Sequence, residues 1–174
     1  MNVELTKFKV KKGKSQHVDE WLKFLNENMK DVLIIPPMDL LLLADPSLEH
    51  VQEYIQRGEC FIAEKENQII GVYILLRTRP ATVELVNIAV DEKEQGLGIG
   101  KWLVMDAIKK ARSSGYEIIE VGTGNSSIGQ LALYQKCGFR ITGIDRDYFV
   151  KHYPEPIFEN GIQCRDMVRL ALDL

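Results

Sequence analysis

The sequence predicts an α/β fold, described equally well as α+β, in which a mixed central β-sheet is flanked by helices. Two apolar segments, 60–65 and 68–78, are separated by a short polar turn and indicate a hairpin. A strand, a helix and another strand follow between residues 83 and 123, and such a passage places its two strands parallel. The chain has 174 residues and neither repeats nor a low-complexity linker, so we predict a single domain over 1–174.

The first part of the chain is predicted to contain a strand and two helices. β-Branched residues favour a strand over 3–10, and a Lys-Lys-Gly-Lys turn follows it. Ser15 can cap an amphipathic helix that carries Trp21. The Pro36-Pro37 pair ends regular structure, and the leucines at 40–43 are expected to pack inward. Asp45 and Pro46 are expected to begin a helix over 47–56, which Gly58 ends.

The second part alternates strands and helices after the hairpin. We expect a strand over 83–90, a glycine-rich loop, a helix from about Lys101 to Ser114 closed by Gly115, and a strand over 117–123. A second helix follows Asn125; its expected apolar residues are Ile128, Leu131, Ala132 and Tyr134. The segments 139–150 and 163–172 are predicted to be the last two strands.

Composition excludes several classes of function. The formal net charge is -3, so the chain lacks the broad positive surface that a nucleic-acid backbone requires, and we expect no nucleic-acid partner. The three cysteines and three histidines are scattered, which favours neither disulfides nor a metal site. The amino terminus shows no signal-peptide pattern, and no apolar segment reaches the ~20 residues that span a bilayer. We therefore expect a cytoplasmic protein without a metal and without membrane contact.

The segment Gln-Gly-Leu-Gly-Ile-Gly-Lys at 95–101 lies between a predicted strand and a predicted helix. Unpaired amide groups and the helix dipole can bind an anionic phosphate at this kind of position. The Walker A pattern fails because Gln95 stands at its first glycine and Trp102 at its Ser/Thr. The dinucleotide pattern GxGxxG fails as well, so neither a nucleoside triphosphatase nor a nicotinamide or flavin enzyme is indicated.

The spacing that fits is Gln-x-x-Gly-x-Gly at Gln95, Gly98 and Gly100, and with it the chain resembles the GNAT superfamily of CoA-dependent N-acetyltransferases. The resemblance covers roughly Pro37 to the carboxyl terminus. The segments PMDLLLLADPS, GTGNSSIGQLALYQKCGFRITGID and ENGIQCRDM look like the small bacterial YvbK-type branch. The resemblance implies two central parallel strands that splay apart and form the acyl-CoA cleft.

The resemblance also implies where acetyl-CoA binds. Its pyrophosphate is expected at the loop, and its pantetheine arm at the backbone of Ile88, Ala89 and Val90, where an N–H group can stabilise an oxyanion. Asn125 matches the family's Asn and is expected to bond the CoA arm. The loop residues implied in cofactor binding are Gln95, Gly96, Leu97, Gly98, Ile99, Gly100 and Lys101.

Two residues are candidates for catalysis. Tyr134 matches the Tyr of the family's N…LY.K.GF motif and is expected to line the cofactor site and to protonate the departing thiolate; its alternative role is that of a core residue. Glu84 matches the pattern E-x-x-x-x-A-[IV] and is the candidate general base. It is expected on the strand face of Val86, Ile88 and Val90, where desolvation raises the pKa of a carboxyl group. A salt-bridge partner is its alternative role.

These features predict an N-acetyltransferase that moves an acetyl group from acetyl-CoA to a primary amine, a small molecule or a peptide, by direct attack in a ternary complex. A catalytically silent CoA-binding sensor is the alternative. Asp145, Asp147 and Glu155 are reserve candidates for the base, and Cys137 is expected to be a packed side chain. Residues 1–35 form a divergent strand-helix segment, interpreted either as an acceptor lid or as an interface in a homodimer.

Overall fold

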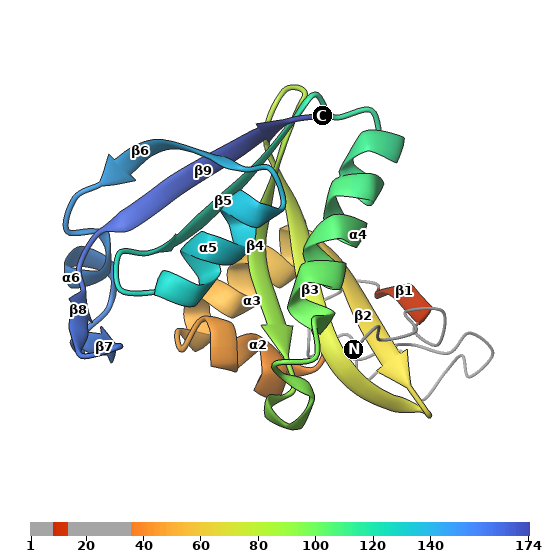
Figure 1. Cartoon of the computed structure of the whole chain (residues 1–174), viewed down its shortest axis with the longest axis horizontal. Coiled ribbons are helices and arrows are strands. Elements are labelled where there is room, and N and C mark those ends of the chain that lie inside the picture. Colours follow the sequence, from red (N-terminus) through yellow and green to blue (C-terminus); the bar gives the residue numbers. More distant parts are fainter. Residues whose placement is uncertain (1–8, 14–35) are drawn as a thin grey trace. The chain divides into compact units, whose positions relative to one another are not determined.

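The computed structural model describes residues 9–13 and 36–174 (Figure 1). These residues form two compact units. The first comprises the described residues up to Leu76 together with Asn87–Leu103, and the second comprises Arg77–Val86 together with Val104–Leu174. Strands β3 (Gln68–Arg79) and β4 (Thr82–Val90) and helix α4 (Ile99–Ser113) each contribute residues to both units. The predicted α/β class with a mixed sheet is confirmed, since the strands pair in both directions.

The first unit contains an antiparallel ladder of β1 (Lys9–Gly13), β2 (Glu59–Lys65) and β3. The predicted hairpin is confirmed: β2 and β3 are joined at Glu66 and Asn67, whose φ angles of 52° and 64° are those of a tight hairpin turn. The turn expected after residue 10 is wrong, because Lys11 to Gly13 continue β1 and pair with β2. The strand expected at 3–8 and the helix expected after Ser15 lie outside the described residues.

Two helices precede the hairpin in the first unit, α2 (Met38–Ala44) and α3 (Leu48–Arg57). The cap predicted at Asp45 is wrong: Ser47 is the N-cap of α3 and accepts the His50 N–H at 3.3 Å, while Asp45 accepts the Ser47 N–H. Gly58 ends α3 as predicted. The leucines of α2 do not all pack inward, because a helix turns its faces every few residues: Leu41 is buried and Leu43 is 54% exposed.

Glycine 71 allows the start of α4 to approach β3 closely within the first unit. A Cβ at this position would lie 2.8 Å from Leu103 Cδ1 and 3.2 Å from the Ala89 carbonyl oxygen. Such distances leave no room for a side chain. Glycine at this position therefore allows the first turns of α4 to pack directly against β3. The first residue of α4, Ile99, is 1% exposed and anchors the same end.

The second unit contains one parallel strand pair and two antiparallel strand pairs that are neighbours in the sheet. β4 pairs parallel with β5 (Ile118–Gly124) over Thr82–Leu85, and it continues to Val90 beyond the residues that pair with β5. β5 pairs antiparallel with β9 (Met167–Asp173), which pairs antiparallel with β6 (Arg140–Asp145), so β6 is the edge strand (Figure 1).

The carboxyl-terminal elements differ from the prediction. Helix α5 (Ile128–Lys136) forms as expected, but of its four expected apolar residues only Tyr134 is buried. The strand predicted over 139–150 ends at Asp145, and Tyr148–His152 form a short helix, α6. The strand predicted over 163–172 is divided, because Ile157–Glu159 (β7) and Ile162–Cys164 (β8) form a separate hairpin before β9.

Candidate active site

The glycine-rich loop of the first unit is exposed and sterically open. Gly96 and Gly98 have φ angles of +75° and +84°, which residues with a side chain adopt only under strain. A Cβ added to either glycine would meet nothing within 4 Å. The loop therefore leaves room for another molecule to approach its backbone.

The main-chain N–H groups of this loop point to what it can bind. The Gln95 N–H donates to the Glu92 carbonyl, and the Trp102 N–H donates to the Gly98 carbonyl at 3.1 Å. Between them, the six N–H groups of residues 96–101 have no acceptor within the described part of the chain. Free donors at the start of a fifteen-residue helix, α4, attract anions. This donor set fits the diphosphate of a coenzyme.

Contacts within the first unit hold the loop to the end of β4. The Gln95 side chain donates to the Val90 carbonyl at 3.1 Å, and the Asp91 N–H donates to the Ile70 carbonyl. Lys65 pairs with Glu94 at 3.0 Å. Gln95 thus has a structural task in shaping the loop, whereas Leu97 and Lys101 are exposed on it.

Burial alternates along β4 as the two-residue period predicts. Val83, Leu85, Asn87 and Ala89 are buried, whereas Glu84, Val86, Ile88 and Val90 are half-buried on the other face. Asn87 is polar on the buried face and is 3% exposed. Its Nδ2 donates to the Tyr54 hydroxyl at 2.7 Å and to the Leu41 carbonyl at 3.0 Å, while its Oδ1 has no partner in the described structure. Sequence reasoning missed Asn87, although strand parity alone places it among buried apolar neighbours.

Glu84 lies in the second unit on β4, and its carboxyl group is 19% exposed. Burial raises its pKa above the ordinary value of a glutamate, and the nearby Arg169 opposes this rise. Arg169 Nη1 donates to Glu84 Oε1 at 3.0 Å. Glu84 therefore combines both expected properties, since it is partly desolvated and also forms an ion pair.

Tyr134 lies in the second unit on α5 and is 4% exposed. Burial is the main cause that raises the pKa of its phenol, so the group is protonated at neutral pH. Its ring packs edge-on against the ring of Phe139, and the two ring centres are 6.0 Å apart. Its hydroxyl has no hydrogen-bond partner among the described residues. A protonated phenol without a structural bond is suited to donate a proton to a ligand.

The Asn125 side chain connects the end of β5 to the corner before β9. Its Oδ1 accepts the N–H groups of Arg165 and Asp166 at 2.8 and 2.9 Å, and its Nδ2 donates to the Gln163 carbonyl. The neighbouring β7–β8 hairpin is bound in a similar way: Ser127 donates its hydroxyl hydrogen to Glu159. Sequence reasoning missed these contacts, which join segments more than thirty residues apart.

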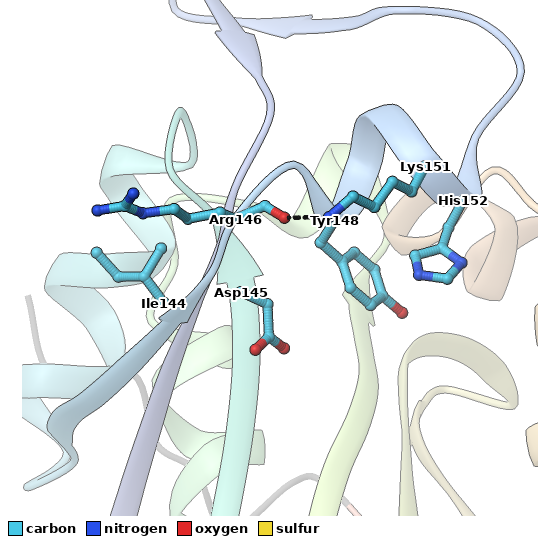
Figure 2. A pocket seen from close by; sticks show the side chains of 6 residues that line it. All are labelled: Ile144, Asp145, Arg146, Tyr148, Lys151 and His152. Carbon is cyan, nitrogen blue, oxygen red and sulfur yellow. Dashed lines mark hydrogen bonds between the residues drawn. The ribbon is translucent and has the colours of Figure 1, made fainter.

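An open pocket of about 560 Å³ lies in the second unit and is lined by residues of β6, of α6 and of the link between them (Figure 2). Asp145, Tyr148 and His152 extend toward one side of it, and the Lys151 ammonium donates to the Arg146 carbonyl at 3.0 Å. The described residues hold no cluster of metal-ligating groups, and no helix among them is long and apolar enough to cross a membrane. All three cysteines are buried and none forms a disulfide.

Comparison with known proteins places the chain in a family. The model of the acetyltransferase (GNAT) family matches residues 21–139, and that of a family of unknown function (DUF6176) matches residues 1–35. The uncharacterized N-acetyltransferase YvbK of Bacillus subtilis is 66% identical over 136 residues, which cover 78% of this chain and 88% of that protein.

Two solved structures support the same assignment. A B. subtilis acetyltransferase in complex with CoA has 56% identity and a TM-score of 0.82, covering 97% of this chain and 99% of that one. A GNAT family acetyltransferase from Elizabethkingia anophelis with acetyl-CoA bound has 43% identity and the same TM-score and coverage. The family match spans more than half of the sequence, and the expected resemblance is confirmed. This chain belongs to the GNAT family of acetyltransferases.

Proposed function

We propose that this protein transfers an acetyl group from acetyl-CoA to a primary amine, a small molecule or a peptide, by direct attack in a ternary complex. The observation that carries the proposal is the set of unpaired N–H groups at residues 96–101, in a loop whose glycines leave open space. The similar solved structures that hold CoA and acetyl-CoA support the same ligand. Acetyl-CoA supplies the activated acyl group as a thioester.

In this proposal the loop, from Gln95 to Lys101, binds the diphosphate, and the backbone of Ile88, Ala89 and Val90 binds the pantetheine arm. A backbone N–H of that strand donates to the thioester oxygen as negative charge develops on it. Asn125 binds the same arm through the second hydrogen of its Nδ2 group, because the first is donated to the Gln163 carbonyl.

Two side chains move protons. An amine is mostly protonated at neutral pH, so Glu84 accepts a proton before attack. A raised pKa brings this carboxylate toward the range in which a base is effective. Tyr134 donates its phenolic proton to the sulfur that leaves, so that CoA departs as a thiol. The N-acetyltransferase names of the relatives favour an enzyme over a silent sensor.

A thiol-release assay tests the proposal. The full chain is mixed with acetyl-CoA and, separately, with polyamines, amino acids, aminoglycosides and peptides. We expect CoA release that depends on one class of amine, and a product heavier by one acetyl group in the mass spectrum. Tight binding of CoA without release for any amine in the panel would contradict the enzyme and support the sensor.

A covalent route through cysteine is tested by the same reagents without an amine. Cys137 is 9% exposed and Cys60 is 1% exposed, so neither offers an accessible nucleophile. We expect the mass of the protein to stay unchanged after incubation with acetyl-CoA alone. An acetyl group on Cys137 would show a two-step reaction and contradict direct attack.

A further inference from the structure

Arg169, in the middle of β9, contacts three side chains of the second unit at once. Its Nη1 donates to Glu84 Oε1 at 3.0 Å, and its Nε donates to Asp145 Oδ2 at 2.7 Å. Its guanidinium carbon lies 5.7 Å from the centre of the Tyr148 ring. These partners belong to β4, β6 and α6, so one cation connects the edge of the sheet to the candidate base.

The shape of a guanidinium group limits what Arg169 can give to Glu84. The group is planar, and its N–H bonds point in fixed directions. Its Nε donates to Asp145, so the edge of the guanidinium that contains Nε is not available to Glu84, and Arg169 gives Glu84 a single bond from Nη1 in place of two parallel bonds. Glu84 receives one bond on Oε1, and its Oε2 has no hydrogen-bond partner among the described residues. That oxygen stays available for a proton.

Other charges also act on Glu84. Glu120 stands opposite Glu84 in the β4–β5 register and repels its negative charge, and Arg79 of β3 pairs with Glu120. The groups that face Glu84 are thus Arg169 from β9, Glu120 from β5 and Arg79 from β3. Asp145 acts on Glu84 through Arg169, whose exposed fraction of 35% allows only partial screening by water.

We propose that Arg169 is a positioning residue for Glu84, and that Asp145 holds Arg169 where it binds only one oxygen of that carboxylate. Without Asp145, Arg169 is free to turn the edge that contains Nε toward Glu84, to donate two parallel bonds to it and to keep it ionised to lower pH. Without Arg169, Glu84 stays protonated to higher pH. The pair therefore sets the pH range in which Glu84 changes its charge. The catalytic meaning of this inference rests on the proposed function, in which Glu84 is the base.

Carboxyl carbon NMR of the full chain labelled with ¹³C-glutamate measures the titration of Glu84 directly and needs no acceptor. The Glu84 signal is assigned by its loss in Glu84→Gln. We expect Arg169→Gln to raise the titration midpoint by about one pH unit, because an opposite charge at this distance lowers a carboxyl pKa by one unit or more. Asp145→Asn should lower it by about half a unit, because the attraction between Glu84 and Arg169 grows.

Two further variants make the test specific. Arg169→Lys keeps the charge but loses the planar fork, so its midpoint should lie between those of the native chain and Arg169→Gln. Glu53→Gln is the matched control, since Glu53 pairs with Arg57 at 2.7 Å on the exposed surface of α3. Its Glu84 midpoint should equal that of the native chain. Thermal unfolding of each variant confirms that the NMR samples are folded.

A Glu84 midpoint that stays unchanged in both Arg169→Gln and Asp145→Asn, or that rises in Asp145→Asn, would overturn the inference. The pH dependence of kcat/KM, measured with the best amine of the panel, separates it from the proposed function. We expect the acid limb to shift with the NMR midpoint. An acid limb that stays fixed while the midpoint moves would remove Glu84 as the base and leave the positioning by Arg169 and Asp145 intact.

Discussion

At the scale of single residues, two buried tyrosines make a contrast that separates structure from catalysis. The Tyr54 hydroxyl accepts a hydrogen bond from Asn87, whereas the Tyr134 hydroxyl has no partner among the described residues. We expect Tyr134→Phe to lower kcat by roughly 100-fold, because general acid catalysis typically contributes that much or more. Acetyl-CoA affinity and the free energy of unfolding should hardly change. Steady-state kinetics, calorimetry and urea unfolding measure the three quantities.

Tyr54→Phe is the control for this prediction. Removal of its hydroxyl leaves Asn87 with one acceptor fewer in the core, so it should lower the free energy of unfolding by about 1–2 kcal/mol. If Tyr134→Phe turned over as fast as the native chain, Tyr134 would be a core residue and the acid would have to be sought elsewhere.

The sequence identified Glu84 and Tyr134 as candidates, but not the groups that determine their properties. Strand parity predicted correctly that Glu84 lies on a face where burial raises its pKa. Its partner Arg169 is eighty-five residues away in the chain, and the order of the strands brings the two together. The residues around Arg169 do not indicate that it pairs with Glu84, because the local sequence of a strand arginine does not depend on which strand carries its partner.

At the scale of elements, the loop before α4 can be compared with the turn that ends the same helix. Gly98 and Gly115 have φ angles of +84° and +79°, and a Cβ at either position would meet nothing within 4 Å. Gly98→Ala and Gly115→Ala should therefore destabilise the fold equally, by about 1–2 kcal/mol of backbone strain. Only Gly98→Ala should weaken CoA binding, by roughly tenfold, because its methyl group enters the space beside the free N–H groups.

Calorimetric titration with CoA measures the binding, and urea unfolding measures the strain. A CoA affinity of Gly98→Ala equal to that of the native chain would show that the diphosphate does not lie against Gly98. A loss of CoA affinity in both variants would trace the effect to stability. Both variants are therefore titrated at one temperature at which each is fully folded.

The corner that Asn125 holds gives a second prediction at this scale. Asn125→Ala removes three hydrogen bonds to the backbone of residues 163–166 and leaves two N–H groups without their acceptor. We expect a loss of about 2–3 kcal/mol in the free energy of unfolding. Amide exchange at Arg165 and Asp166 should become faster. Gln135→Ala removes an exposed bond within α5 and is the control, for which both quantities should stay native.

Unfolding in urea and amide exchange followed by NMR check this prediction. Protected amides at 165 and 166 in Asn125→Ala would show that the corner is held by other contacts. In that case the side chain of Asn125 would be important chiefly for a ligand.

Elements with a strong local signal were predictable, and short elements were not. The β2–β3 hairpin followed from its two apolar segments and the polar turn between them, and α4 followed from its period and from Gly115. Helix α6 was missed because Tyr148, Phe149 and Val150 favour strands in isolation. The β7–β8 hairpin was missed because its strands have three residues each, too few to show a period.

At the scale of the whole molecule, the family assignment reaches further than the sequence patterns. The resemblance began near Pro37, whereas the family match begins at residue 21 and the solved relatives align with 97% of the chain. A single domain over 1–174, a divergent role for residues 1–35 and a homodimer stay predictions. The physical reason is that assembly and acceptor choice depend on surfaces, and surfaces leave no periodic signal in a sequence.

Stability at high pH is a property of the whole molecule, because several buried acids share it. Burial raises the pKa of the Cys60 thiol to about 12 and raises the pKa of the Tyr54 and Tyr134 phenols. The unfolded chain loses these protons near pH 9 to 10. A raised folded-state pKa adds stability that is complete below the unfolded value and is lost as pH rises toward the folded value. Between about pH 9 and 12 the free energy of unfolding should therefore fall.

Each group contributes a slope of about 1.4 kcal/mol per pH unit once its unfolded form is ionised. Urea unfolding at pH 7, 9 and 10.5 measures the sum. Cys60→Ala removes one ionising group, so its curve should fall less steeply than the native curve above pH 9, although it begins lower because a buried side chain is truncated. Cys60 carries no catalytic role here, so activity is not part of this comparison. Parallel curves for Cys60→Ala and the native chain would mean that the thiol ionises equally well in the folded protein, in contradiction to its 1% exposure.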